Sequence, residues 1–233
     1  MASAANESAL NRPIWSALTT GDRRFADGGA LALRFPADIA PFGATANDSP
    51  EAFAALRELI SQDDRVALVT LDMLKRYPGL EIVREAPIIQ MIADPATPTP
   101  SQGLAPIVLG PSDVPEMLYL AEQTQPGPFG PRTHELGQYI GVRADGALAA
   151  MAGERMRLDG AVEISAVCVS PEHRGKGYAA LLVAWLVHKL REDGATPFLH
   201  VFTDNPAIAL YERLGFRTRK TLRLTVLSRA SDA

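Results

Sequence analysis

The sequence predicts an α/β fold in which helices flank a mixed, mostly antiparallel sheet, preceded by a smaller α/β lobe. Two Asp-Gly pairs, at Asp145 and Asp159, lie between segments with strand character. Asp-Gly is a strong hairpin signal because both turn positions tolerate positive φ. A glycine-rich turn then joins a strand at residues 161–169 to a long apolar helix at 178–191. These observations predict the sheet and the main helix of the larger, C-terminal half.

A proline-rich segment divides the chain. Three prolines lie within residues 95–100, where they remove backbone donors and disfavour helix on both sides. We therefore predict an N-terminal α/β lobe over residues 1–94, a linker over 95–103 and the main domain over 104–228.

The N-terminal lobe shows ordinary strand and helix signals and no catalytic motif. Ser49 and Pro50 open a helix as N-cap and N1 residues, and this helix runs to residue 60. Apolar runs predict strands around it, and the segment between two of them reads as a short helix or a turn. The predicted strands cover residues 31–35, 66–71 and 80–93, the last as one or two strands, and the short helix or turn covers 71–77. No phosphate loop, metal-ligand cluster or nucleophile-base pair is found there.

The second half has a more regular pattern. Ser112 caps a helix that ends near residue 123. The loop at 124–136 is rich in proline and glycine, which suits a rigid flap over a pocket and equally an ordinary crossing. The remaining predicted strands cover 107–109, 139–143, 147–157, 161–169, 198–202 and 219–227, with helices at 178–191 and 206–214.

Composition restricts the class of protein. Charged residues make up 21% of the chain, apolar residues 47%, and the net charge is -4, so a nucleic-acid duplex or an anionic membrane is not the expected partner. Cys168 is the single cysteine, so no intrachain disulfide can form. Residues 1–11 lack a basic stretch followed by an apolar run, and no apolar run approaches the roughly 18 residues of a spanning helix. We expect a soluble cytoplasmic protein, as a monomer or a homodimer, with a small-molecule partner.

The turn between the strand at 161–169 and the helix at 178–191 carries the chemistry. A helix start presents unpaired N–H groups and the positive end of the helix dipole, so the amides from Gly175 to Ala179 can cradle a diphosphate. Arg174 and Lys176 add positive charge. The turn matches neither the Walker loop nor the dinucleotide-binding fingerprint.

Two segments resemble a known family. Arg174-x-x-Gly177-x-Ala179 resembles the [QR]-x-x-G-x-[GA] signature of the GNAT superfamily of N-acetyltransferases. Thirty residues on, the segment 205–216 resembles the family's N-x-x-A-x-x-L-Y-x-x-x-G-F segment. The resemblance covers about residues 104–227.

The resemblance implies acetyl-CoA as cosubstrate and no metal. In the family, the strand before the signature splays from the following strand and admits the pantetheine arm, and the signature loop holds the diphosphate. The corresponding coenzyme-binding residues here are Val167, Cys168 and Val169 in the strand, Arg174, Gly175, Lys176, Gly177, Tyr178 and Ala179 in the loop, and Asn205 in the second segment.

The resemblance also implies two catalytic residues. Tyr211 matches the tyrosine that serves as general acid to the departing thiolate, which suits a phenol of pKa about 10. Glu163 matches the position of a strand glutamate that serves as general base. Strand alternation predicts that Glu163 faces the same side as Val167 and Val169, and partial burial is expected to raise its pKa. His134, in the Pro/Gly-rich loop, is a further candidate base.

Structural interpretations stand beside these roles. Glu163 also fits a solvated strand carboxylate, and Tyr211 a packing aromatic. Alternation places Cys168 on the face opposite Glu163, in the core. His173 is predicted to be a solvated loop residue. The basic residues of the last strand are predicted to form a solvated face or to hold the adenosine 3′-phosphate: Arg217, Arg219, Lys220 and Arg223.

The sequence therefore predicts an N-acetyltransferase that moves an acetyl group from acetyl-CoA to the primary amine of a small molecule or peptide by direct attack. A non-catalytic acetyl-CoA-binding regulatory module and a structural protein with the same fold remain as alternatives. The N-terminal lobe is a candidate degenerate GNAT-like lobe that shapes the acceptor pocket.

Overall fold

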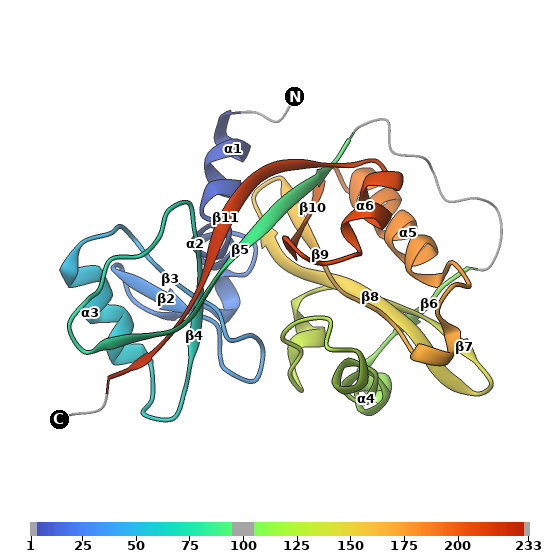
Figure 1. The fold of residues 1–233 in the computed structure, drawn as a ribbon, viewed down its shortest axis with the longest axis horizontal. Coiled ribbons are helices and arrows are strands. Elements are labelled where there is room, and N and C mark those ends of the chain that lie inside the picture. The colour runs from blue at the N-terminus through green and yellow to red at the C-terminus, as the bar shows by residue number, and fades with distance from the viewer. Residues whose placement is uncertain (1–3, 95–104, 231–233) are drawn as a thin grey trace.

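A sheet of eight strands forms the centre of the molecule (Figure 1). The computed structural model describes residues 4–94 and 105–230, so the linker predicted at 95–103 lies outside the described residues. The strands are β4 (Val66–Thr70), β5 (Leu80–Ala93), β6 (Ile107–Leu109), β7 (Tyr139–Ala144), β8 (Ala147–Leu158), β9 (Ala161–Val169), β10 (Thr196–Phe202) and β11 (Phe216–Arg229). Their order is β4-β11-β5-β10-β9-β8-β7-β6, and every neighbouring pair except β9 with β10 is antiparallel. The predicted mixed, mostly antiparallel sheet is confirmed.

Strand β5 brings the first half of the chain into the centre of this sheet. It pairs with β10, where Phe198 lies opposite Ile92, and on its other side with β11 along nearly its whole length. The segment predicted as one or two strands is a single strand of 14 residues. Strands from both sides of the predicted linker thus share one sheet.

The two Asp-Gly hairpins predicted from the sequence are present. Asp145 and Gly146 both adopt positive φ, 53° and 81°, in the turn between β7 and β8. Gly160 adopts a φ of 72° in the turn between β8 and β9. These turns require residues that tolerate the left-handed region, which is why the Asp-Gly signal was informative.

Helices cover both faces of the sheet. On one face, α5 (Tyr178–Glu192) packs its apolar side chains against β7, β8, β9 and β10, and α6 (Ile208–Arg213) packs against β11. The other face is covered by α4 (Val114–Thr124) and by the N-terminal helices α1 (Ala4–Asn11) and α2 (Pro13–Thr19). No helix in the described part of the chain is long and apolar enough to cross a membrane.

The N-terminal lobe adds a second, small sheet. It contains β1 (Asp27–Gly28), β2 (Ala32–Arg34) and β3 (Gly43–Thr45), and α3 (Pro50–Leu59) packs beside it. Ser49 caps α3 as predicted, because its hydroxyl accepts a hydrogen bond from the Ala52 amide at 3.2 Å. The segment 71–77 contains no helix. Helices α1 and α2 were not predicted.

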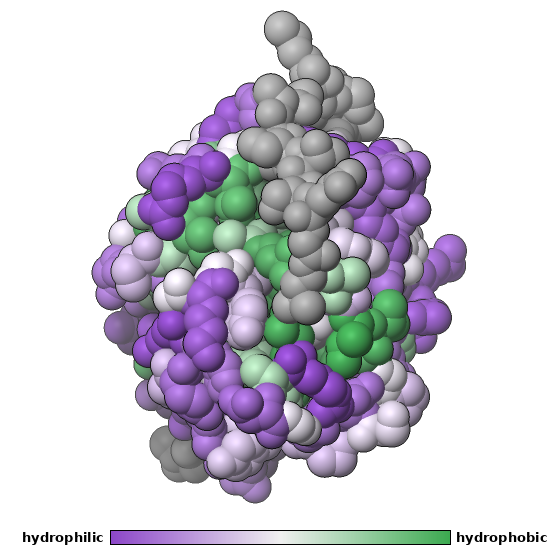
Figure 2. All heavy atoms as spheres, turned by 90° about the vertical axis from the view of Figure 1, so that its right-hand side faces the viewer, coloured by the Kyte–Doolittle hydropathy of each residue, from purple (hydrophilic) through white to green (hydrophobic). Residues whose placement is uncertain are grey.

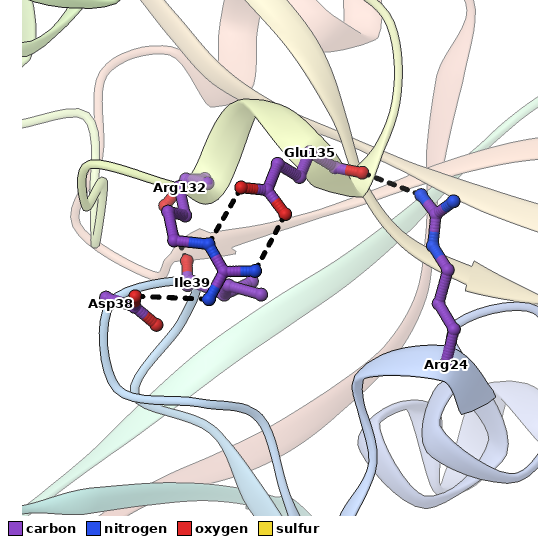
Figure 3. A network of polar contacts seen from close by, with 6 residues as sticks. Arg24, Asp38, Ile39, Arg132 and Glu135 are labelled. Carbon is purple, nitrogen blue, oxygen red and sulfur yellow. Dashed lines mark hydrogen bonds and ion pairs between the residues drawn. The ribbon is translucent and has the colours of Figure 1, made fainter.

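The loop that follows α4 is tied to the N-terminal lobe at η3 (Thr133–Leu136), as Figure 3 shows. The Arg132 guanidinium donates to both carboxylate oxygens of Glu135, at 2.8 and 2.9 Å, and to Asp38 at 3.2 Å. Arg24 donates to the backbone carbonyl of Glu135 at 2.8 Å. Exposed ion pairs of this kind contribute little stability each. The contacts with Asp38 and Arg24 nevertheless connect the loop to the lobe at two points, so the C-terminal end of the loop has a defined place.

A buried carboxyl links the N-terminal lobe to the main sheet. Asp22 precedes η1 (Arg23–Phe25), is 2% exposed and accepts a hydrogen bond from the Arg157 amide at 2.8 Å. Burial raises the pKa of Asp22 to about 7, against the lowering effect of the Arg157 hydrogen bond.

We expect the Asp22→Asn variant to lose a pH dependence that the wild type shows. An unfolded carboxyl ionises near pH 3.8, whereas folded Asp22 keeps its proton up to about pH 7, so the free energy of unfolding should fall as pH rises between these values. Asparagine retains an acceptor for Arg157 and cannot ionise. The variant should therefore be more stable than the wild type near pH 8, by about 1–3 kcal/mol. Urea unfolding at several pH values measures this, and an unchanged pH slope in the variant contradicts it.

Candidate active site

Strands β9 and β10 diverge beside the glycine-rich turn. Their parallel pairing covers three residue pairs and ends where Glu163 lies opposite Phe198. Beyond this point, within the part of the chain that the structure describes, β9 pairs only with β8 and β10 pairs only with β5. Among those residues, 164–169 therefore present a strand edge that has no partner strand on the β10 side.

A β-bulge at Ala166 changes which side chains share a face of β9. Ala166 has a φ of 52°, and the register with β8 shifts between the Gly153–Ser165 and Met151–Cys168 pairs. As a result Val167 and Val169 join the cluster under α5, the face opposite Glu163. The prediction that these valines share a face with Glu163 is therefore wrong, because simple alternation does not continue through a bulge.

The bulge also places Cys168 on the same side of the sheet as Glu163, rather than on the opposite one. Cys168 is 6% exposed and packs beside α4 with Met117 and Tyr139. Burial raises the pKa of its thiol to about 11. The predicted core position is confirmed, and only the backbone of Cys168 faces the gap between β9 and β10.

The turn after β9 exposes the residues of the predicted diphosphate cradle. Gly175 and Gly177 have φ values of 78° and 82°, in the left-handed region that favours glycine. The turn runs into α5, and within the described residues no acceptor is found for the amides from Gly175 to Ala180. Arg174 and Lys176 are exposed and have no carboxylate partner in the described parts of the chain. The turn thus offers free donors and positive charge at a helix start.

His173 differs from its prediction. It is 8% exposed, and its Nδ1 lies 2.8 Å from the Ser170 hydroxyl. The side chain fastens the start of the turn to the end of β9 instead of standing in solvent. The prediction of a solvated loop residue is therefore wrong.

Tyr211 projects from α6 into the cluster under α5. It is 8% exposed and packs edge-on against Phe216, with 6.0 Å between ring centroids. Burial raises the pKa of its phenol to about 12. No hydrogen-bond partner of the hydroxyl is found among the residues described. Asn205, just before α6, accepts a hydrogen bond from the Ala207 amide at 2.8 Å, which leaves its side-chain NH₂ group available.

Glu163 lies at the last pair of the β9/β10 ladder and is fully buried. Arg155 donates to both of its carboxylate oxygens, at 2.6 and 2.7 Å, and Nδ1 of His200 lies 2.8 Å from one of them. Burial raises the pKa of Glu163, but Arg155 and His200 outweigh it and bring the pKa to about 2. The expected increase in the pKa of Glu163 is therefore wrong.

Sequence reasoning missed the partners of Glu163. Counting back from the hairpin turn places Met156 opposite Glu163, but a second bulge, between Glu154 and Arg157 of β8, brings Arg155 there. His200 lies in the strand predicted at 198–202, and no sequence pattern singled it out. Arg219 was predicted to lie on a solvated face or to hold the adenosine 3′-phosphate. Its side chain is only 6% exposed and donates a hydrogen bond to the buried Gln90.

The surface near the turn combines apolar and polar areas. Figure 2 shows the side of the molecule on which α5, α6 and β7 lie, where apolar patches interrupt a mostly hydrophilic surface. Half-buried apolar side chains are present on β9, α5 and α6, among them Val167, Leu181 and Ile208. Free amides beside apolar surface suit a ligand that has an anionic end and a less polar arm. No group of side chains able to hold a metal ion is found in residues 4–94 and 105–230.

Comparisons with known proteins agree with this geometry. A family model described as FR47-like protein matches residues 139–224. A solved structure from Novosphingobium aromaticivorans, described as an acetyltransferase of the GNAT family, is 39% identical over 95% of this chain and 99% of its own, with a TM-score of 0.89. A GCN5-related N-acetyltransferase from Kribbella flavida shares the fold at 22% identity, over 93% and 94% of the two chains, with a TM-score of 0.63. No curated protein matches the sequence.

The chain belongs to the GNAT family of acetyltransferases, and its fold is that of an acyltransferase. The resemblance stated from two short motifs in the C-terminal half is thereby confirmed. The relative from Novosphingobium aromaticivorans matches nearly the whole chain, so it also includes the N-terminal lobe.

We expect Glu163→Gln to destabilise the protein strongly. The change leaves the buried Arg155 guanidinium without its counter-charge, and breaking one side of a buried ion pair typically costs about 3–5 kcal/mol. Glu58→Gln is the matched control, because Glu58 pairs with Arg57 on the surface, and it should change stability little. Urea unfolding of both variants measures the difference. Equal denaturation midpoints for Glu163→Gln and the wild type contradict the expectation.

Proposed function

We propose that the protein is an N-acetyltransferase that transfers the acetyl group of acetyl-CoA directly to the primary amine of a small molecule or peptide. One observation carries the proposal: β9 and β10 diverge before a turn whose amides have no acceptor among the residues that the structure describes. The open strand edge suits the amide-containing pantetheine arm, and the helix start suits the diphosphate. Membership of the GNAT family supports the same assignment.

The coenzyme would be held largely by main-chain groups. The backbone of residues 167–169 pairs with the pantetheine arm, and the amides of Gly175–Ala179 surround the diphosphate. Arg174 and Lys176 add charge-assisted contacts, because neither is engaged by a carboxylate in the described residues. Asn205 contributes its side-chain NH₂ group.

Acyl transfer then needs one proton donor for the departing sulfur. The acceptor nitrogen attacks the thioester carbonyl, a C–N bond forms, the C–S bond breaks, and the thiolate takes the phenolic proton of Tyr211. Burial raises the pKa of Tyr211 to about 12, so the phenol holds its proton at neutral pH, and the same shift makes it a weaker acid than a free phenol.

The acceptor must also lose a proton, and Glu163 is poorly suited to take it in this state. Its carboxylate is fully buried and bonded by Arg155 and His200, and with a pKa of about 2 it is a weak proton acceptor. Each pKa unit below the working pH adds about 1.4 kcal/mol to its protonation. A role for Glu163 as general base would therefore require the pair with Arg155 to open. We propose instead that Glu163 positions its partners Arg155 and His200. The acceptor amine then loses its proton to water.

The alternative is a regulatory module that binds acetyl-CoA without transferring the acetyl group. In such a module Tyr211 would serve only to pack against Phe216. The Tyr211 hydroxyl has no hydrogen-bond partner within residues 4–94 and 105–230, which favours the enzyme, since a phenyl ring would pack equally well there.

Tyr211→Phe tests the proposal. With acetyl-CoA and a panel of amines, we expect the wild type to release free thiol, and the variant to show a kcat about 100-fold lower with an unchanged KM for acetyl-CoA. Tyr119→Phe, on an exposed face of α4, is the matched control and should behave like the wild type. Binding of acetyl-CoA without thiol release from any amine would favour the regulatory module. Absence of binding would contradict both.

A further inference from the structure

A row of buried polar side chains crosses five neighbouring strands on the face covered by the N-terminal helices. One residue comes from each strand, in sheet order β11, β5, β10, β9 and β8. We call these residues the polar row: Arg219, Gln90, His200, Glu163 and Arg155. Gln90 and Glu163 are fully buried, and the other three side chains are at most 10% exposed.

Hydrogen bonds join the row from end to end. Arg219 donates to Oε1 of Gln90 at 2.9 Å, Nε2 of Gln90 lies 3.0 Å from Nε2 of His200, and His200 contacts Glu163 through Nδ1. The carbonyl oxygen of Gln90 accepts from Arg219, so the group of Gln90 that faces His200 is its NH₂, which can only donate. The His200 imidazole therefore accepts at Nε2 and donates its Nδ1–H to Glu163, and a single tautomer satisfies both neighbours.

The row is anchored to helix α1. Nε2 of Gln90 also donates to the carbonyl of Leu10 at 2.9 Å. Arg219 donates to the carbonyl of Glu7 and to the side-chain oxygen of Asn11, each at 2.9 Å. The N-terminal helix is thereby linked through side chains to strands β9 and β10.

The link between His200 and Glu163 lies where the β9/β10 backbone ladder stops. The last backbone pair joins Phe198 to Glu163, and His200 is the next residue of β10 on the same face. Two residues beyond the last paired residue of β10, a side-chain hydrogen bond thus still joins β10 to β9. Further along, no hydrogen bond between the two strands is found in residues 4–94 and 105–230.

We propose that the polar row sets how far β9 and β10 diverge. The gap between these strands, which we call the groove, would hold the thioester arm of the coenzyme, and His200 is a positioning residue for it. Buried polar and ionic groups are weak evidence for stability, because well-packed apolar residues stabilise a core as well or better, and their best-attested use is to fix register. Here the row fixes the point at which the groove opens. It also gives the N-terminal lobe an effect on coenzyme binding. The inference rests on the proposed function, in that the groove is taken to bind acetyl-CoA.

Calorimetric titration with acetyl-CoA tests the proposal on His200→Leu and His200→Asn. Leucine removes the donor to Glu163, whereas asparagine keeps an N–H close to the position of Nδ1. We expect His200→Leu to bind acetyl-CoA about tenfold more weakly and His200→Asn to recover most of the affinity. His188→Asn, on an exposed part of α5, is the matched control and should bind like the wild type.

The titration separates positioning from folding. A merely structural role would lower the number of binding-competent molecules, seen as reduced stoichiometry, and leave the Kd unchanged, and that result overturns the proposal. Should His200→Leu fail to fold, Gln90→Met carries the test, because it interrupts the row on the other side of His200 and leaves the Arg155–Glu163 pair intact. A wild-type Kd in that variant also overturns the proposal. If the wild type itself does not bind acetyl-CoA, the proposed function fails first, and this inference fails with it.

Discussion

The end of backbone pairing between β9 and β10 is the constraint on which the rest of the site depends. Up to Glu163 and Phe198 the strands share a ladder, and beyond them, among residues 4–94 and 105–230, β9 pairs only with β8 and β10 only with β5. The bulge at Ala166 turns Val167 and Val169 toward α5 and leaves their backbone along the gap. The same strand then leads directly into the turn that carries free amides, so both halves of the proposed coenzyme site follow from one divergence.

Such a divergence has to be stabilised, because strands with unpaired edges tend to close or to recruit other partners. In the proposed arrangement, the side-chain hydrogen bonds of the polar row hold the two strands in their diverging positions. Arg155 neutralises Glu163, and His200 connects Glu163 to Gln90 and so to helix α1. The N-terminal lobe is therefore part of the same fold as the C-terminal half. It contributes β5, which lies between β10 and β11, and helix α1, which anchors the polar row.

Features that depend on neighbouring residues could be predicted from the sequence, whereas features that depend on contacts between distant residues could not. The Asp-Gly hairpins, the glycine turn and the helix after it depend on local backbone preferences, and all were predicted. The insertion of β5 between β10 and β11 depends on pairing between residues more than a hundred positions apart, which no local pattern reveals. The bulge in β8 brings Arg155 beside Glu163, and the parallel pairing of β9 with β10 brings His200 there, so neither partner followed from local alternation.

A crystal structure of the protein with coenzyme A is the most direct test of this account. It should show the diphosphate oxygens within hydrogen-bond distance of the amides from Gly175 to Ala179, with the pantetheine arm lying between β9 and β10. Coenzyme bound elsewhere, or a β9/β10 ladder that continues past Glu163 in the complex, would contradict the central claim.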